Sequence, residues 1–283
     1  MYYEKLQELY NQIDVSELQT IDVNSSSIFE GLLRVAFCKC IQLNQMIHES
    51  INNDNSFLYL PNIRGICEEI IVLKFIDDLI SDSDKDILLL SMSKLTIAKE
   101  LREQELFIRK YRPAQPVLKE DFANNFKGEE ISEVLNRNGI NGNKMPPTAQ
   151  MADRIGLKEL YDYLYRGSCS FVHFNPRIMQ RTIWAEKNST KVYKTSITNF
   201  HKYYFSFSSF YCSYLLVLLY KYFGHYFHLS TEHVKIFVEI KEFIRRTRHY
   251  PELVTFEEVD LKRPKTQLTV INDFLKNQIF EEE

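Results

Sequence analysis

A short polar stripe in the middle of the sequence carries residue types that could cleave a phosphodiester. Asp162, Arg166, Ser170 and His173 follow one another at steps of four, four and three residues. On an α-helix with about 3.6 residues per turn, this spacing places the side chains on one narrow face. A guanidinium could bind phosphate, and an imidazole that titrates near neutrality could move the protons of metal-free RNA cleavage. The sequence therefore predicts Arg166, Ser170 and His173 as catalytic residues, and Asp162 would position them.

The same stripe has a second interpretation, in which it only holds helices together. An Asp–Arg pair four residues apart, with a hydrogen-bonded histidine nearby, is an ordinary way to satisfy polar groups between packed helices. The sequence alone leaves both interpretations open.

A second candidate lies on a helix that is apolar on nearly all sides. Arg64 and Glu68 align with Ile71 and Phe75, so the charged pair is predicted to run into a buried stripe. Burying a charge is costly unless it is paired, so the two side chains should bond each other or a neighbouring helix. Either Arg64 is a second phosphate ligand positioned by Glu68, or the pair fixes the register of the helices.

Two further arginines follow the stripe. Arg177 and Arg181 lie four residues apart just after Pro176, and with the stripe they could form a local basic surface in which Arg177 binds phosphate. Surface charge is more often just a solvated helix face, and that interpretation is favoured here. The run at 245–249 is predicted to end a helix, where its cations offset the helix dipole.

Helical periodicity along most of the chain predicts the elements that must position these residues. With only 8 Gly and 8 Pro in 283 residues, the composition favours long helices over a turn-rich β fold. We predict an all-α fold of long antiparallel helices, with a single domain over 1–250, a looser insertion at 112–150 and a tail at 251–283. The predicted helices cover about 27–51, 61–79, 84–110, 129–136, 157–173, a short helix from 176, 196–228, 230–249 and 268–280.

Composition and missing motifs exclude several classes of protein. A formal net charge of −3 excludes a strongly basic nucleic-acid coat, so any RNA contact must come from a local patch. The five cysteines show no zinc-ligand spacing, and neither a metal site nor a cofactor is predicted. The sequence contains no Gly-rich phosphate loop, no His-Glu-x-x-His and no Gly-x-Ser-x-Gly, which argues against a nucleotide-driven motor, a zinc peptidase and an α/β-hydrolase.

One uncharged segment bears on the location of the protein. Residues 203–220 reach the lower length limit of a membrane span, but four serines interrupt the first half. We therefore favour a buried central helix over a membrane span, and a membrane-associated protein that uses residues 203–220 is the less favoured alternative. The scattered cysteines and an N-terminus without a basic start and apolar run predict a cytoplasmic protein.

Two blocks resemble a family of uncharacterised bacterial all-α proteins. Arg64-Gly-Ile-Cys-Glu-Glu-Ile is followed, about a hundred residues later, by Tyr165-Arg-Gly-Ser-Cys-Ser-Phe-Val-His173, and the resemblance covers roughly 25–228. More distantly, Arg166 followed by His173 is similar to the Arg-x(4–6)-His signature of HEPN domains. These are helical bundles, often dimeric, and many are metal-independent RNases of toxin–antitoxin and phage-defence systems.

The HEPN resemblance implies a HEPN-like bundle in which Arg166 and His173 form a composite site across a homodimer. It also implies RNA as the substrate and an antitoxin or defence-system protein as a partner. The chain departs from the HEPN pattern at Gly167, where those RNases usually have a polar residue. The resulting prediction is a metal-independent endoribonuclease of a bacterial toxin or phage-defence system. The alternative is a non-enzymatic helical scaffold or binding module whose Arg/Ser/His network is structural.

Overall fold

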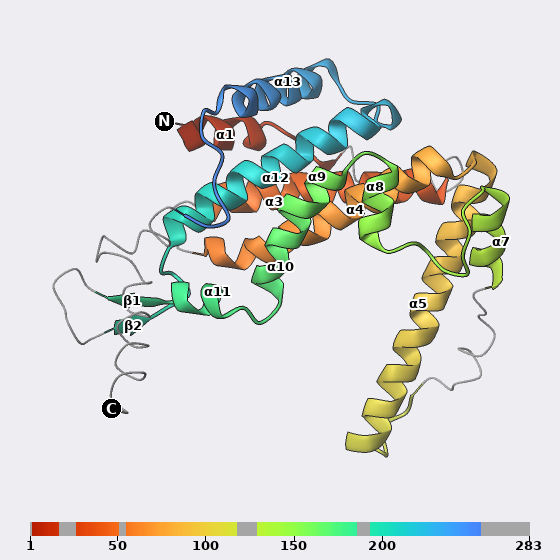
Figure 1. The fold of residues 1–283 in the computed structure, drawn as a ribbon. Coiled ribbons are helices and arrows are strands. Elements are labelled where there is room, and N and C mark those ends of the chain that lie inside the picture. The colour runs from red at the N-terminus through yellow and green to blue at the C-terminus, as the bar shows by residue number, and fades with distance from the viewer. Residues whose placement is uncertain (1, 17–26, 51–54, 118–128, 186–192, 256–283) are drawn as a thin grey trace, which may run out of the picture. The chain divides into compact units, whose positions relative to one another are not determined.

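The computed structural model describes residues 2–16, 27–50, 55–117, 129–185 and 193–255. Helices dominate these residues (Figure 1), which confirms the predicted all-α class. The long helices are α3 (Ile28–Glu49), α4 (Leu60–Leu79), α5 (Asp82–Tyr111), α12 (His201–Phe223) and α13 (Thr231–Arg246). The short helices are α1 (Tyr2–Asn11), α7 (Glu129–Arg137), α8 (Thr148–Arg154), α9 (Lys158–Leu160), α10 (Arg166–Val172) and α11 (Pro176–Arg181), with 3₁₀ turns η2 (Ser56–Tyr59) and η4 (Gly224–Tyr226).

A small hairpin interrupts the helices in the described part of the chain. Strands β1 (Ile183–Ala185) and β2 (Tyr193–Thr195) pair antiparallel, with Ile183 opposite Thr195. The helix predicted from residue 196 therefore begins later, at His201, after a turn that ends at Phe200 with a left-handed φ of 65°. The hairpin and α1 were not predicted, and the helix predicted at 268–280 lies outside the described residues.

Internal contacts divide the chain into two compact units. The first unit comprises residues 1–19, 36–69 and 159–283, and the second comprises 20–35 and 70–158. The boundaries fall inside α3 and α4, so the single domain predicted over 1–250 stays a prediction.

The first unit is built around α12, which packs against α13 and η2 (Figure 1). The aromatic side chains of α12 are largely buried in the core of this unit. The ring of Phe171 in α10 packs edge-on against the rings of Tyr204 and Phe207. Ser208 and Ser213 of α12 are buried, and their hydroxyls donate to the carbonyls of Tyr204 and Ser209 in the same helix. The predicted buried central helix is thus confirmed. Among the described residues, no helix combines the length and apolarity needed to cross a bilayer.

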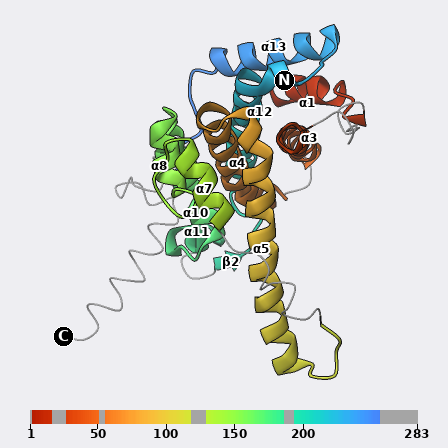
Figure 2. The same ribbon diagram turned by 90° about the vertical axis from the view of Figure 1, so that its right-hand side faces the viewer.

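The second unit centres on α5, with α7 alongside it (Figure 2). Arg137 of α7 donates to Asp84 of α5 over 2.6 Å, which fixes the two helices together. The Asp86 carboxylate accepts from the backbone amides of Ile28 and Phe29 at 3.1 and 3.0 Å, and so caps the first turn of α3. This unit contains none of the side chains predicted to carry chemistry.

Candidate functional site

The predicted catalytic residues lie on a helix made of three successive pieces, which we call the motif helix (residues 158–172). It consists of α9, a π-helical turn η3 (Tyr161–Tyr165) and α10. In the π turn the amide of Arg166 bonds the carbonyl of Tyr161, five residues back. Such turns are wider than an α-helical turn and often occur at functional sites.

The motif helix ends one residue earlier than predicted, and this changes the position of the key histidine. The last helical residue is Val172, and His173 has extended backbone with ψ of 159°. The reason is the start of α11: Pro176 begins that helix, and Asn175 Oδ1 accepts from the amide of Arg177 at 3.0 Å. The prediction of an unbroken helical stripe is therefore wrong at its last position, His173.

The N-terminal part of the stripe is present and open to solvent. Arg166 Nη1 lies 3.6 Å from Asp162 Oδ1, and the two side chains are 67% and 43% exposed. The guanidinium thus leans one turn toward the start of the helix, as helical side chains tend to do. An exposed pair of this kind adds little to stability.

Ser170 has its proton committed inside the helix. Its hydroxyl donates to the carbonyl of Gly167 over 2.6 Å. The hydroxyl proton is therefore used in a bond to the backbone and is not offered to a substrate. The geometry gives Ser170 no evident catalytic role.

His173 is an exposed side chain whose ring has no hydrogen-bond or ion-pair partner among the residues that the structure describes. Its backbone amide closes the last turn by donating to Cys169 over 2.9 Å. The next residue, Phe174, is 84% exposed, the largest exposure among the described large apolar side chains. An imidazole and an aromatic ring therefore face solvent together where the motif helix ends.

Arg64 contacts the motif helix but is committed to neighbouring side chains. It donates to Glu68 at 3.2 Å and to the Tyr165 hydroxyl at 2.6 Å, and its guanidinium lies 4.7 Å from the centre of that ring. The Tyr161 ring stacks on Tyr165 at 4.9 Å, so a cation and two rings form one column.

The environment of Arg64 keeps it charged. Burial acts to lower the pKa of its guanidinium, but contacts with Cys169 and Glu68 outweigh burial and leave the pKa raised. Its side chain is 27% exposed, so the predicted ion pair is present but only partly buried. One donor of Arg64 joins α4 to the motif helix through the Tyr165 hydroxyl, and another bonds Glu68 within α4. The arrangement therefore favours the register-fixing interpretation over a phosphate ligand.

The two arginines of α11 do not form the predicted exposed basic face. Arg181 is only 1% exposed, and its guanidinium lies 4.4 Å from the centre of the Tyr203 ring. It donates to the carbonyl of Leu253 at 2.9 Å, and Arg177 donates to the same oxygen at 2.8 Å. A buried guanidinium needs such partners, and a carbonyl from 72 residues further along the chain supplies one here. The prediction of exposure was therefore wrong for Arg181, and Arg177 is held in the same contact.

The chain after α13 returns to the motif helix, which the sequence did not indicate. We call residues 251–255 the C-terminal strap. The Pro251 carbonyl accepts from the hydroxyls of Tyr211 and Tyr163 at 2.7 and 3.2 Å. Leu253 packs directly over Gly167, where a Cβ would overlap its methyl groups. This contact explains why the residue after Arg166 has no side chain.

No group of three His, Cys, Asp or Glu side chains among the described residues could hold a metal ion.

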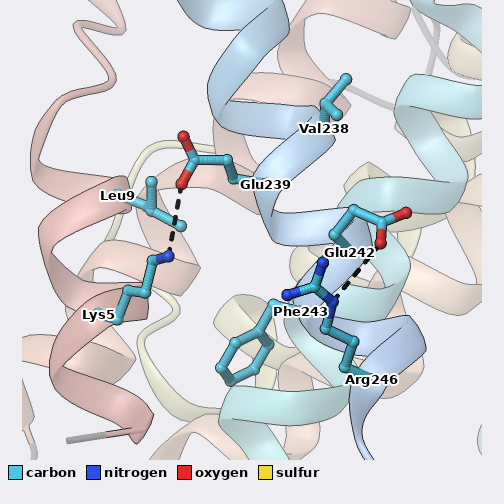
Figure 3. A pocket seen from close by; sticks show the side chains of 7 residues that line it. All are labelled: Lys5, Leu9, Val238, Glu239, Glu242, Phe243 and Arg246. Atoms are coloured by element: carbon cyan, nitrogen blue, oxygen red, sulfur yellow. Dashed lines mark ion pairs between the residues drawn. The ribbon is translucent and has the colours of Figure 1, made fainter.

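A cavity of about 710 Å³ lies between α1 and α13, where Lys5 points toward Glu239 and Arg246 pairs with Glu242 (Figure 3). Its lining includes none of the residues predicted to carry chemistry.

Comparison with known protein families identifies the family of this chain. The model of a family of unknown function, DUF5677, matches residues 30–192. No curated protein and no solved structure matches the chain. The matched range contains Arg64, Arg166 and His173 and ends before the C-terminal strap. An uncharacterised, helical family was predicted and is confirmed, whereas the HEPN resemblance stays a prediction.

Proposed function

This chain belongs to the family of unknown function DUF5677, and we propose that it is a metal-independent endoribonuclease of a bacterial toxin or phage-defence system. The observation that carries the proposal is the state of His173, an exposed imidazole without a partner among the described residues. Of the other candidates, Ser170 and Arg64 are committed to internal bonds, while Arg166 is 67% exposed. Arg166 and His173 are thus the pair left open to a substrate.

The proposed reaction is transesterification within an RNA strand. His173 accepts the proton of a ribose 2′-hydroxyl, whose oxygen attacks the adjacent phosphorus while the bond from phosphorus to O5′ breaks. Arg166 binds the nonbridging oxygens and the charge that develops on them. The products are a 2′,3′-cyclic phosphate and a 5′-hydroxyl, and the leaving oxygen takes its proton from a second imidazole or from water. The exposed ring of Phe174 offers a surface on which an unpaired base can stack.

The spacing of the two residues favours a composite site. Seven residues correspond to roughly 10 Å along a helix axis, and the Arg166 guanidinium leans toward Asp162, which lies in the opposite direction from His173. A single copy therefore does not present both groups to one phosphate in this arrangement. A homodimer that joins Arg166 of one copy with His173 of the other would do so, and each of its two sites would then hold one imidazole, so the leaving oxygen would take its proton from water.

The test is cleavage of a labelled single-stranded RNA by the full chain, in the presence of a metal chelator. His173→Ala should lower the rate by at least about a hundredfold, because it removes the group that moves the proton. The melting temperature should change by no more than about 2 °C, since the side chain is exposed. Mass spectrometry should find cyclic phosphate ends on the products of the native protein.

The matched control for this test is His228→Ala, which removes another exposed histidine and should leave cleavage intact. If the native protein cleaves no RNA, or if His173→Ala cleaves as fast as the native protein, the ribonuclease proposal fails.

A second candidate function is a non-enzymatic binding module. The column formed by Arg64, Tyr165 and Tyr161 favours it, because these polar and aromatic groups serve to join α4 to the motif helix. Under this alternative, the protein would bind a partner without cleaving RNA. Replacing Tyr165 by Phe would then weaken both partner binding and stability, and His173→Ala would change neither.

A further inference from the structure

A cavity with aromatic walls lies beside the motif helix, and neither the sequence nor the proposed reaction accounts for it. Its volume is about 610 Å³, within the usual range for small-molecule sites. Its wall includes Tyr163 of the motif helix, Phe210 and Tyr214 of α12, and Tyr250 from the chain after α13. Arg248 and Glu159 also line it. All of these residues belong to the first unit.

The rings of this aromatic cavity are available to a ligand. Tyr250 is 55% exposed and Tyr163 is 43% exposed, although both line the hollow. The Tyr250 ring lies 4.8 Å from that of Phe210, which is itself buried. A planar ligand that covers the exposed rings would replace water on them and gain stacking contacts.

The wall is held in place before any ligand binds. Tyr211 donates to the Pro251 carbonyl over 2.7 Å, and its hydroxyl lies 3.0 Å from that of Tyr163. These bonds connect α12, the motif helix and the C-terminal strap around the cavity. A preformed wall lowers the entropy cost of binding.

The charges around the aromatic cavity select among ligands. Arg248 is exposed and has no ion pair or hydrogen bond within the part of the chain that the structure describes, so its guanidinium is open to an anion. The carboxylates of Glu159 and Glu252 also line the cavity and can accept from ligand N–H and O–H groups. A simple organic cation would meet Arg248, and a bare anion would meet the two carboxylates. A ligand with a flat ring, hydrogen-bond donors and one anionic group suits all three.

We propose that the aromatic cavity binds one nucleotide, with its base stacked on Tyr250 and Tyr163 and its phosphate on Arg248. The carboxylates accept from the exocyclic amino group of the base or from ribose hydroxyls. The nucleotide can be free or can be one unpaired unit of an RNA strand. In the second case the inference rests on the proposed ribonuclease function and adds a base-binding subsite on the motif helix.

The experiment is calorimetric titration of the full chain with each of the four nucleoside 5′-monophosphates, the matching nucleosides, a five-nucleotide single-stranded RNA and tetramethylammonium. The RNA titration uses His173→Ala protein so that no strand is cut. We expect Tyr250→Ala to weaken nucleotide binding about tenfold, because stacking on one ring contributes roughly 1–3 kcal/mol. Tyr250→Phe should bind like the native protein. Arg248→Gln should weaken binding of nucleotides but not of nucleosides.

Matched controls come from exposed residues outside the cavity. Tyr111 is 52% exposed and, like Tyr250, lies against a phenylalanine ring, so Tyr111→Ala should bind nucleotides normally. Arg154→Gln removes an exposed arginine elsewhere and should also have no effect.

The outcomes distinguish a free nucleotide from an RNA strand as the ligand, and they test the cavity assignment separately from the ribonuclease proposal. Binding of monophosphates that depends on Tyr250 supports a free nucleotide, whereas Tyr250-dependent binding of the RNA alone supports a strand. Tight binding of tetramethylammonium without nucleotide binding overturns the inference, and so does nucleotide binding that Tyr250→Ala leaves unchanged. Nucleotide binding by a protein that cleaves no RNA would retain the cavity assignment and reject the ribonuclease.

Discussion

His48 is the buried counterpart of the exposed His173. It is only 1% exposed, and its ring lies 5.1 Å from that of Tyr10 and 5.9 Å from that of Phe205. Its Nε2 is 3.1 Å from the Ser209 hydroxyl, whereas Nδ1 has no hydrogen-bond partner among the described residues. Burial lowers the pKa of His48 to about 4, because the charged imidazole would lose its hydration. The residue therefore serves the core in its neutral form.

At the residue scale, this burial predicts how stability depends on pH. An unfolded histidine has a pKa of about 6.5, so between that value and the folded pKa of about 4 the unfolded chain binds more protons. The contribution of His48 to the free energy of unfolding is therefore complete above pH 6.5. It decreases as the pH falls toward 4, by about 3 kcal/mol in all. Urea unfolding at pH 7, 6 and 5 would measure it.

The control variant for His48 is one that keeps an aromatic ring at this position but cannot bind a proton. His48→Phe retains the contacts with Tyr10 and Phe205 and removes the titrating group, so its stability should fall less between pH 7 and 5 than that of the native protein. Equal pH dependence in His48→Phe and the native protein would contradict the assignment.

At the element scale, the C-terminal strap and α10 are fitted to each other at one position. Leu253 occupies the space that a side chain at Gly167 would need. Arg177 and Arg181 hold the Leu253 carbonyl from α11, and Tyr163 holds the Pro251 carbonyl from the motif helix. The polar residue that HEPN RNases usually carry after the arginine would therefore overlap the Leu253 side chain, which would have to move.

This fit predicts energetic coupling between Gly167 and Leu253. Alanine is favoured over glycine in a helix by about 1 kcal/mol, but in the native protein the added methyl group meets Leu253. Gly167→Ala should therefore be less favourable in the native background than in a Leu253→Ala background, by about 1 kcal/mol or more. A double-mutant cycle from urea unfolding measures the difference.

Gly65 provides the control for this cycle. It lies in α4, and nothing comes within 4 Å of a Cβ built there. Gly65→Ala should therefore change stability equally with and without Leu253. Additive effects for Gly167 and Leu253 would show that the strap does not rest on the motif helix in solution.

At the scale of the whole molecule, the formal net charge of −3 gives no general attraction for RNA. Binding must then come from local groups such as Arg166 and Arg248, and a second copy would double their number. The composite site proposed above makes the homodimer the active form.

A complementation experiment tests the composite site. Arg166→Ala and His173→Ala should each be inactive as pure proteins. In a mixture that exchanges subunits, half of the dimers carry one variant of each kind, and each of these has one intact site of two. The mixture should recover roughly a quarter of the native activity. Sedimentation at the assay concentration checks that dimers form, and an inactive mixture of exchanging dimers would rule out the composite arrangement.

Much of the fold could be predicted from local signals in the sequence. α3, α4, α5 and α13 begin and end within a few residues of the predicted positions, because apolar periodicity and flanking breakers act over short stretches. Ser230 caps α13 by accepting from the amide of His233, and serine is a favoured residue at this position of a helix. The β1–β2 hairpin was missed because its strands are only three residues long and too short to show a period.

The sequence by itself determined the helical class, the order of the long helices and the residue types that could act on a phosphate. Only the tertiary structure decided which of them are open to solvent. Arg166 and Arg181 are both helical arginines in the same region, yet the first is exposed and the second is buried under the strap. The difference arises from contacts with residues about 70 positions further along the chain. Local periodicity carries no information about such contacts, because burial depends on which distant segments pack together.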